Sequence, residues 1–446
     1  ITMSARGEFS SRLGFVLAAA GSAVGLGNIW GFPSQVAQNG GAAFVLVYLI
    51  LAFFLAYPVL MAELIIGRAT RANVVDALGA ITQSKAGRYV GLWGALTASL
   101  ILSFYAIVAG WMLAYFVEST LTLVTDKSSL TWFVDFSFSR NWFFCLLFLS
   151  FTAAIVTGGV RQGIEKWSVR LMPTLVILIV ALIIYVSLQE GAIDGWRAYL
   201  IPDFSKVTDP ELLISAMGQA FFSMSLGVGT MLVYGSYIAK SENLPALGAS
   251  VALVDIGVAV LAGMLIIPAM YVAQANGVAI FTESGTLIEG DALIFNVLPS
   301  LFASIGNIGV VIASVFFALM SIAAVTSSIS MLEVPVSYLV EDKAVSRTKA
   351  VWVMTLVILG ISTVIIANFG DLFGLVITLT TQYSQPLLGL IMCVFVGWVW
   401  RRNAILSELK EGFAGAEQSL FWKIWPVYVK FVCPIIIGVM FIRTVL

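Results

Sequence analysis

The stretch GSAVGLGN, Gly21 to Asn28, lies inside the first long apolar segment of the chain. It places three glycines, a serine and an asparagine where a membrane-spanning helix is expected to continue without interruption. Glycine costs about 1 kcal/mol relative to alanine in a helix interior. Unwound backbone at membrane depth is tolerated only where protein or a water-filled cavity covers it. The stretch therefore predicts a broken helix whose freed peptide groups bind something.

The composition around this stretch is that of a polytopic membrane protein. Of the 446 residues, 60% are hydrophobic and 11% are charged, whereas soluble domains carry about 25% charged residues. A net charge of −1, without a basic patch, argues against nucleic acid as a partner. The chain has no histidine, which removes imidazole bases and the common His-containing metal sites. We therefore expect a membrane protein that is not an enzyme.

Apolar segments of about 20 residues mark the membrane spans. We predict an all-α protein with eleven spans, over residues 12–37, 42–67, 88–123, 141–158, 166–188, 211–239, 246–274, 302–340, 348–368, 371–400 and 420–444. With the N-terminus in the cytoplasm, the outside segments hold only Lys127, Arg140, Arg197, Lys206 and Arg443. The positive-inside rule then fixes this orientation, with the C-terminus outside. No soluble domain is expected, so residues 1–446 form a single membrane domain.

A second stretch of the same kind, SMSLGVGT from Ser223 to Thr230, lies inside the sixth predicted span. Aligning GLGN (25–28) with GVGT (227–230) gives two repeats, at about 12–188 and 211–400, followed by an extra helix at about 420–444. Because each repeat has five spans, the two have opposite orientation, as in secondary transporters with a broken first helix in each half. Two matched breaks favour a binding site over the close helix packing that a lone glycine-rich stretch indicates.

Such a break offers ligands for two kinds of charge. Unwound carbonyls ligate a cation, and the N–H groups where the helix resumes bind a carboxylate. Asp255 is a lone carboxylate in the apolar run ASVALVDIGVAVLAG. An acid inside the membrane is costly and is a functional-site hypothesis by default. A zwitterion and a cation can share a site of this kind.

Four stretches carry a resemblance to a known family: RLGFVLAAAGSAVGLGNIWGFP (12–33), NGGAAF (39–44), GQAFFSMSLGVGT (218–230) and ALMSIAAVTSSISMLE (318–333). Over essentially its whole length the chain resembles the neurotransmitter:sodium symporter family, in its bacterial amino-acid-transporting branch. The resemblance implies a leucine-transporter-type fold with a 5+5 inverted repeat and broken helices 1 and 6. Eleven spans are typical of bacterial variants such as the multi-hydrophobic amino-acid transporters of bacilli or the bacterial tyrosine transporters, between which the motifs do not choose.

The resemblance also implies two sodium sites. One is expected from the carbonyls of Gly21, Val24 and Ala323 with the hydroxyls of Thr326 and Ser327. The other, linked to the substrate, is expected from Ala23, Asn28, Ser223 and Asp255. Neutral oxygens suit a hard ion that must be released again. Asp255 resembles a built-in replacement for the chloride that other relatives bind, which implies transport without chloride.

Substrate contacts are implied by the same match. Tyr105 and the Leu26 and Gly27 N–H groups are expected to hold a carboxylate. The substrate-binding residues as a whole are expected to be Ala23, Leu26, Gly27, Ile101, Tyr105, Phe222, Ser223, Ser225, Val228, Ser327 and Met331. Valine at 228, where relatives for small aliphatic substrates often carry an aromatic residue, implies a larger pocket. The expected substrates are therefore Trp, Tyr, Phe, Leu and Val.

The gates depart from the family pattern. The arginine that closes the outer gate in many relatives is Gly31 here, and the aspartate facing it is Gly374, so another contact involving Trp30 and Phe222 is expected. At the inner gate, Phe9 replaces a tryptophan. The remaining inner-gate residues are expected to be Arg6, paired with Glu341 or Asp342, together with Tyr234 and Ser236. An inner water path is expected in span five, where Gly163 and Pro173 bracket nine residues.

We interpret the chain as a sodium-coupled symporter of hydrophobic and aromatic L-amino acids in the bacterial inner membrane, working by alternating access. A gated ion channel also has polar breaks at midplane, but it lacks a pocket for a carboxylate and an amine beside the ions. An intramembrane enzyme is disfavoured because no nucleophile and base are paired. Coupling to protons instead of sodium remains open, because Asp255 is titratable.

Overall fold

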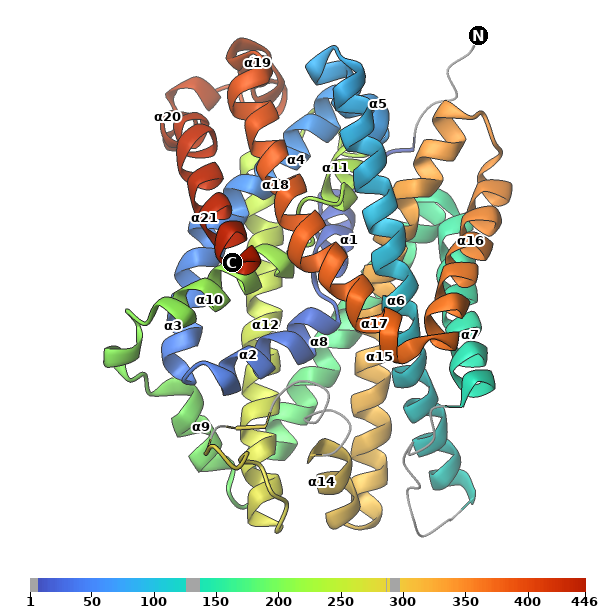
Figure 1. The fold of residues 1–446 in the computed structure, drawn as a ribbon, viewed down its shortest axis with the longest axis vertical. Coiled ribbons are helices and arrows are strands. Elements are labelled where there is room, and N and C mark those ends of the chain that lie inside the picture. Colours follow the sequence, from blue (N-terminus) through green and yellow to red (C-terminus); the bar gives the residue numbers. More distant parts are fainter. Residues whose placement is uncertain (1–6, 126–136, 286, 289–296) are drawn as a thin grey trace.

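The computed structural model describes residues 7–125, 137–285, 287–288 and 297–446, and it is helical throughout (Figure 1). Among these residues the only β pairing is a single bridge between Phe281 and Leu287. The helices are α1 (Arg12–Ala23), α2 (Phe32–Gln38), α3 (Ala42–Leu51), α4 (Tyr57–Thr70), α5 (Val74–Thr82), α6 (Lys85–Thr125), α7 (Phe138–Thr157), α8 (Lys166–Ser187), α9 (Ala192–Leu200), α10 (Pro210–Ser223), α11 (Thr230–Gly235), α12 (Leu244–Ala275), α14 (Leu298–Ser304), α15 (Asn307–Asp342), α16 (Arg347–Ala367), α17 (Phe369–Ile377), α18 (Gln385–Val394), α19 (Arg402–Gly412), α20 (Leu420–Val427) and α21 (Cys433–Val445).

Short turns of other helical types continue several of these helices. The π-helical segments are η1 (Gly27–Gly31), η2 (Ala52–Ala56), η3 (Val160–Glu165), η6 (Thr378–Ser384), η7 (Phe395–Val399) and η9 (Tyr428–Val432). The 3₁₀ turns are η4 (Phe204–Lys206) and η8 (Ala416–Gln418). Three of these π-helical segments, η2, η6 and η9, join two α-helices into one span, as η2 does between α3 and α4.

Within the described ranges, nine helical segments are long and apolar enough to cross a membrane. They are Ala42–Thr70, Lys85–Leu123, Phe138–Thr157, Val160–Ser187, Leu244–Ala275, Asn307–Asp342, Arg347–Ala367, Phe369–Val399 and Leu420–Val445. The pair 12–23 and 27–38, bent by 66° at its break, makes a tenth when it is counted as one span. The sequence predicted eleven, and the difference is the predicted span 211–239. It is divided into α10 and α11, neither of which has the roughly 20 residues of a span.

Local sequence explains where the divided helices begin. Ser11 caps α1 by accepting a hydrogen bond from the Gly14 N–H. Asp209 caps α10 by accepting from the Glu211 N–H, with Pro210 as the first helical residue, where its missing N–H costs nothing. Between α10 and α11, Gly227 and Gly229 both have φ +90°, a conformation that glycine adopts without steric cost. The predicted break in the sixth span is therefore present at the predicted glycines.

The broken helices lie in the interior of the helix assembly. The first helix, α1, packs against α8, α12 and α15, and α11 packs against α4 and α15. The break residues Val24, Asn28 and Leu226 are buried. Helices α5, α19 and α20 lie at the top end of the view, and α9 and α14 lie at the bottom end (Figure 1).

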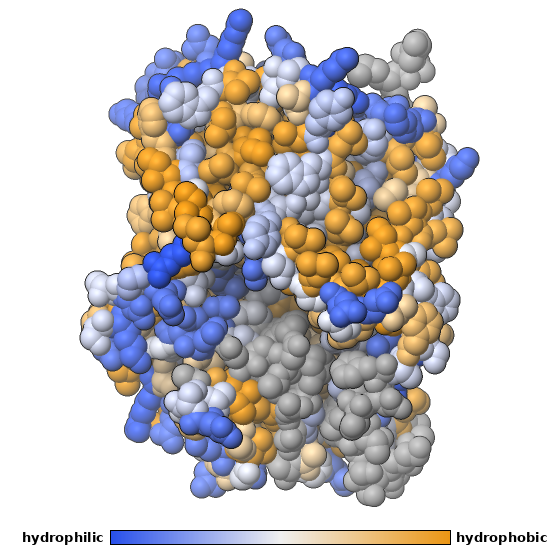
Figure 2. Space-filling view, viewed as in Figure 1, coloured by the Kyte–Doolittle hydropathy of each residue, from blue (hydrophilic) through white to orange (hydrophobic). Residues whose placement is uncertain are grey.

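The surface has the distribution of a membrane protein. Orange, hydrophobic side chains predominate over the upper half of the face in Figure 2, between blue side chains at the top edge and a mixture of blue and pale side chains below. Exposed apolar side chains such as Ile177, Leu356 and Ile435 lie on segments that qualify as spans. Such a belt is expected where lipid tails are the solvent.

Candidate functional site

A cavity of about 540 Å³ lies at the two helix breaks. All eleven residues that the sequence assigned to substrate binding line it: Ala23, Leu26, Gly27, Ile101, Tyr105, Phe222, Ser223, Ser225, Val228, Ser327 and Met331. They come from α1 and η1, from α6, from α10 and the linker after it, and from α15. Segments up to about 300 residues apart in the chain thus meet at one place.

Further residues line the cavity that the sequence did not assign to substrate binding: Gly25, Asn28, Gly31, Gln35, Phe104, Val108, Gln219, Phe373, Ile377, Thr381, Gln382 and Gln385. Phe104 and Val108 could have been found, because with Ile101 and Tyr105 they follow the i, i+3, i+4, i+7 spacing of one helix face. The residues from α17, η6 and α18 carry no such signal, since only the packing of those segments over the cavity brings them there.

One end of the cavity suits a carboxylate. The Leu26 N–H donates to the Tyr105 hydroxyl at 3.3 Å. A Cβ at Gly25 would lie 2.8 Å from that hydroxyl, so only glycine allows this approach. At Gly27, which is exposed, a Cβ would meet nothing within 4 Å. A hydroxyl and the N–H groups of a restarting helix thus lie together beside open space, which is the arrangement that binds an anion.

The second break supplies a hydroxyl group and an apolar side chain to the cavity lining. Between α10 and α11 the linker turns through Ser225, Gly227 and Gly229, all with positive φ. The Ser225 hydroxyl reaches the Ser22 carbonyl at 3.5 Å, which joins the two breaks. Val228, only 2% exposed, contributes its side chain to the cavity lining.

Oxygen atoms converge at the first break. The Ser327 hydroxyl lies 3.3 Å from the Gly21 carbonyl, 3.2 Å from that of Ser22 and 3.0 Å from that of Val24. One hydroxyl proton serves one of these acceptors at a time, and carbonyls in the last turn of a helix have no intrahelical partner. Such a surplus of neutral oxygens suits a hard cation.

The rest of the first expected ion site lies beside this cluster. The Thr326 hydroxyl donates to the Ala323 carbonyl at 3.0 Å, one residue before Ser327 on α15. The five residues that the sequence grouped as one sodium site, Gly21, Val24, Ala323, Thr326 and Ser327, thus lie on the facing segments of α1 and α15. Ser22, which the sequence did not include, adds a sixth oxygen.

The predicted substrate-linked ion site surrounds Asp255. The Asn28 amide donates to Asp255 Oδ1 at 2.8 Å and to Ser223 Oγ at 3.3 Å, and the Ser223 hydroxyl donates to Asp255 Oδ2 at 2.6 Å. Tyr48, which the sequence did not single out, donates to Ser223 Oγ at 3.3 Å. Ala23 lies in the adjoining cavity wall.

Only neutral donors therefore meet this carboxylate. Asp255 is fully buried, and the ion pairs between described residues do not include it. A buried negative charge without a cationic partner attracts a cation. Among the described residues, no group of three or more His, Cys, Asp or Glu is arranged to hold a metal ion.

A second buried carboxylate, Glu63 in α4, lies behind the linker. Neither of its oxygens has a hydrogen-bond partner among the described residues, although the peptide groups of Gly227 and Gly229 are close enough to interact with it. Glu63 was not among the functional residues predicted from the sequence. An acidic residue inside the apolar second span was the available signal.

On the side where the sequence places the outer gate, the described cavity lining carries no charged residue. Gly31 and Gly374 leave this side without the ion pair of many relatives, and a Cβ at Gly374 would meet nothing within 4 Å. On this side the Gln219 amide donates to the Gly27 carbonyl at 3.3 Å. Phe222 lines the cavity as expected, whereas the side chain of Trp30 lies outside the described part of the structure.

An aromatic cluster fills the inner side. The Phe9 ring, 5% exposed, packs edge-on against Phe15, Tyr234 and Tyr237, with centroids 5.5, 5.9 and 6.3 Å away. The Phe9 N–H also donates to the Tyr237 carbonyl at 3.0 Å. Phe9 therefore holds the segment before α1 against the end of α11.

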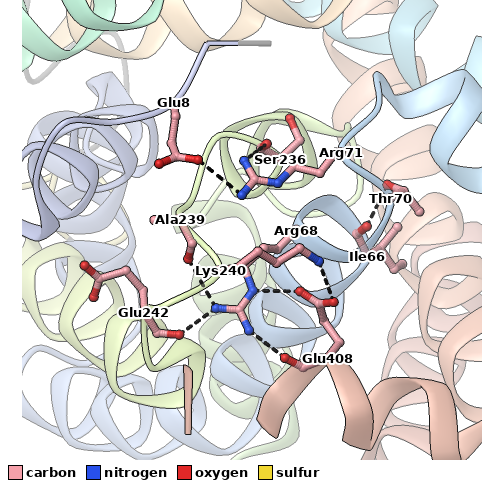
Figure 3. Close-up of polar contacts among 10 residues, drawn as sticks. All are labelled: Glu8, Ile66, Arg68, Thr70, Arg71, Ser236, Ala239, Lys240, Glu242 and Glu408. Atoms are coloured by element: carbon pink, nitrogen blue, oxygen red, sulfur yellow. Dashed lines mark hydrogen bonds and ion pairs between the residues drawn. The ribbon is translucent and has the colours of Figure 1, made fainter. Parts of the chain in front are cut away.

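The charged residues of the expected inner gate have other partners here. Glu341 accepts hydrogen bonds from the Asn73 backbone and side chain, each at 2.9 Å, and Asp342 pairs with Arg88 at 2.9 Å. Arg6 lies outside the described residues, so its pairing with either carboxylate stays a prediction. The Ser236 carbonyl accepts from Arg71, which also pairs with Glu8 at 3.3 Å (Figure 3).

Beside the expected inner gate, the buried Arg68 side chain joins three segments of the chain by hydrogen bonds, an arrangement called here the Arg68 hub. Its fully buried guanidinium donates to the Glu408 side chain at 2.8 Å, to the Glu408 carbonyl at 2.7 Å and to the Glu242 carbonyl at 2.5 Å (Figure 3). Lys240 pairs with the same Glu408 carboxylate at 2.7 Å. These contacts join the end of α4 to the α11–α12 connection and to α19. Nothing in the sequence around Arg68 indicated its partners.

The segment expected to form the inner water path is helical here. Gly163 is buried within η3, and Pro173 lies inside α8. The irregular backbone is at Gly159, with φ +76°. Glu165, at the end of η3, accepts hydrogen bonds from the Ser10 N–H at 2.9 Å and the Ser10 hydroxyl at 2.7 Å. The start of α1 is therefore tied to this segment.

Comparisons with known proteins agree with one another. A family model described as the sodium:neurotransmitter symporter family matches residues 6–139 and 134–446. An uncharacterized sodium-dependent transporter of Bacillus subtilis (strain 168), YhdH, is 31% identical over 98% of this chain and 97% of its own length. One from Haemophilus influenzae is 34% identical over 98% of each. The crystal structure of MhsT in complex with L-phenylalanine is 35% identical, with a TM-score of 0.83, over 98% of this chain and 100% of that one.

Proposed function

The chain belongs to the sodium:neurotransmitter symporter family, and from this membership we propose that it carries hydrophobic and aromatic L-amino acids across the membrane together with sodium, by alternating access. The family consists of sodium-dependent transporters, not enzymes. The observation that carries the proposal is the cavity at the two helix breaks, which all eleven expected substrate-binding residues line.

The shape and chemistry of the cavity support this substrate class. Tyr105 and the Leu26 and Gly27 peptide groups bind the carboxylate, and the oxygens of Ser225 and of the linker bind the ammonium. Ile101, Val228 and Met331 supply an apolar wall. MhsT, which is similar over its whole length, has been solved with phenylalanine, an amino acid of this class.

Two sodium ions are co-transported in this proposal. One is held by the oxygens around Ser327, where three carbonyls face one hydroxyl. The other is held beside Asp255 by Asn28, Ser223 and Ala23, and the substrate carboxylate lies next to it. A shared site of this kind makes substrate binding depend on sodium.

The coupling ion is tested by uptake into proteoliposomes that contain the purified protein. With an imposed inward sodium gradient and equal pH on both sides, we expect accumulation of labelled phenylalanine. With an imposed proton gradient and no sodium, we expect none. Accumulation driven by protons alone would replace sodium coupling by proton coupling, the alternative that the titratable Asp255 leaves open. Passive sodium flux without amino-acid accumulation would indicate a channel.

Chloride independence is tested in the same assay. Asp255 supplies a fixed negative charge beside the substrate-linked ion, so replacing chloride by gluconate is expected to leave uptake by the wild type unchanged. Asp255→Asn is expected to lose uptake or to acquire a chloride requirement. Asp203→Asn, which removes a carboxylate from an exposed turn, is the matched control and is expected to behave as the wild type. Chloride-dependent uptake by the wild type would contradict the role given to Asp255.

The membrane arrangement forms part of the proposal. Counting α10 and α11 together as one broken span brings the number of spans to eleven, in two inverted repeats of five with an extra helix over 420–444. The N-terminus is then cytoplasmic and the C-terminus extracellular, in a bacterial inner membrane. Protease protection of tags placed at the two ends in sealed vesicles measures this orientation directly.

A further inference from the structure

A second cavity, of about 240 Å³, lies away from the substrate site, between η7, the start of α19 and the α20–η9 segment. Its lining consists of Val396, Gly397, Trp400, Arg402, Ile405, Trp422, Trp425, Pro426, Val427, Val429, Lys430 and Phe431. Two of these residues are cations, three are tryptophans, and none carries a carboxylate. The proposed transport cycle makes no use of this cavity.

Both cations lack an acidic partner. The Arg402 guanidinium lies 5.2 Å from the centre of the Trp422 ring, and the Lys430 ammonium lies 4.4 Å from that of Trp398. In the part of the chain that the structure describes, neither has a carboxylate oxygen within 4.0 Å. A cation over an aromatic face keeps its full charge and its hydrogen-bond donors. Both side chains thus remain able to bind an anion.

Two of the four indole N–H groups around the cavity are also without a described acceptor. The indole N–H groups of Trp398 and Trp425 donate to backbone carbonyls at 2.9 Å. Those of Trp400 and Trp422 donate to no described residue. In addition, α19 begins at Arg402 without a side-chain cap, so the positive end of its dipole lies at the same place. Among the described lining residues, every unpaired polar side chain is a donor or a cation, and the complementary ligand is an anion.

The surroundings indicate that this anion has apolar chains. Lys430 lies within the apolar segment Leu420–Val445, where an unpaired cation is costly. Beside it, Trp398 is 57% exposed and Val427 is 51% exposed, on segments that qualify as membrane spans. The cavity is near the end of the molecule where α19 and α20 lie (Figure 1). A soluble anion would leave this apolar surface uncovered, whereas an acyl chain covers it.

We propose that Arg402, Lys430 and the indoles of Trp400 and Trp422 bind the phosphodiester headgroup of an anionic phospholipid, whose acyl chains lie along the exposed apolar face of η7 and η9. Basic pockets between membrane helices bind anionic headgroups in this way. A phosphatidylcholine headgroup carries its own cation, which Arg402 and Lys430 repel. The site therefore selects for net negative charge.

Native mass spectrometry of the purified full chain, titrated with equimolar dioleoyl-phosphatidylglycerol and dioleoyl-phosphatidylcholine, tests the proposal. We expect the first bound phosphatidylglycerol to be preferred about tenfold or more over phosphatidylcholine, since each basic residue near the surface contributes about fivefold. The double variant Arg402→Gln/Lys430→Gln is expected to lose this preference. The charge-preserving swap Arg402→Lys/Lys430→Arg is expected to keep most of it.

Lys423→Gln is the matched control, because Lys423 is an exposed cation on α20 that does not line the cavity. It is expected to bind phosphatidylglycerol as the wild type does. Equal loss in Lys423→Gln and in the double glutamine variant would show a non-specific charge effect and overturn the site. Displacement of the lipid by millimolar inorganic phosphate would overturn the lipid assignment in favour of a soluble anion. Sodium-dependent phenylalanine binding by each variant serves as the folding check, and a misfolded glutamine pair is replaced by Arg402→Met/Lys430→Met, for which the same loss is expected.

Discussion

Ser327 illustrates how the atoms around one side chain determine what that side chain can bind. Its hydroxyl faces three carbonyl oxygens of the first break within 3.3 Å, so in the absence of a cation these oxygens share one proton. A bound cation satisfies all of them together. Asp255 illustrates the complementary case, a buried charge for which the structure provides only neutral donors.

Replacing Ser327 by alanine is expected to lower the apparent sodium affinity about tenfold or more, since an oxygen bound to a charged group contributes about 1.5–3 kcal/mol. The measurement is the sodium dependence of amino-acid uptake. Ser321→Ala, which removes a hydroxyl that bonds only within α15, is the matched control and is expected to leave sodium activation unchanged. Wild-type sodium activation in Ser327→Ala would contradict the site.

Replacing Val228 by phenylalanine is expected to penalise large substrates selectively. The added ring enters a packed cavity wall, which costs about 1–3 kcal/mol wherever substrate occupies the same space. Tryptophan reaches that space and leucine does not, so the ratio of their apparent affinities is expected to change ten- to hundredfold. Competition of both amino acids against one labelled substrate measures the ratio. An equal fall for both would show that Val228 does not contact the substrate side chain.

At the scale of elements, each break is built by glycines for a different physical reason. Gly25 allows close approach, because a Cβ there would meet the Tyr105 and Ser327 hydroxyls. Gly227 and Gly229 have φ +90°, which residues with a Cβ rarely adopt. At Gly227 a Cβ would in addition lie 2.6 Å from the Gln385 carbonyl of α18. The second break is therefore fixed both by local conformation and by the helix that packs on it.

Gly227→Ala is expected to lower the melting temperature and to abolish uptake, since the strained φ costs about 1–2 kcal/mol before the contact with Gln385 is counted. The matched control is Gly257→Ala, in the middle of α12, where a Cβ would meet nothing within 4 Å. It is expected to leave uptake unchanged and to stabilise slightly, because alanine is the better helix former. Equal melting temperatures for the two variants would argue against a strained linker.

At the scale of the whole molecule, the two sides of the cavity are closed by different means. Among the described residues, the outer side has the amide-to-carbonyl contact from Gln219 to Gly27 and the edge-on contact of the Phe104 and Phe373 rings, 6.3 Å apart. The inner side has the Phe9 cluster, together with the buried Arg68 hub that ties α4 to α19. Because the inner side combines ring contacts with a buried ion pair, we infer that this arrangement holds the cavity closed toward the end where α5 and α19 lie.

Phe9→Ala tests that inference. Each aromatic pair contributes about 0.5–1.5 kcal/mol, so removing three is expected to shift the balance toward the inward-open state about tenfold or more. The apparent affinity for phenylalanine in sodium then falls, by at most the same factor, because the binding-competent fraction falls. Leu13→Ala, on an exposed position of α1, is the matched control and is expected to bind as the wild type does. Unchanged affinity in Phe9→Ala would assign closure of the inner side to other residues.

The sequence by itself determined the elements that have strong local causes. Long apolar segments predicted most of the spans within a few residues, because hydrocarbon requires about 20 apolar residues whatever the tertiary fold. The eighth span begins at Asn307, later than the predicted 302, since Gly306 with φ +77° separates it from α14. The two glycine motifs predicted the breaks, and their match predicted that distant segments meet at one cavity.

Only the tertiary structure decided which side chains meet when no local pattern links them. The contacts of Tyr48, Gln219 and Arg68 depend on how far one helix is shifted and rotated against another, and hydrophobic periodicity fixes the buried face but not that shift. The same holds for Arg402 and Lys430, which the sequence leaves as two separate cations. Helix packing brings them to one cavity with unpaired indoles, because side-chain neighbours across helices are set by the global arrangement and not by spacing along the chain.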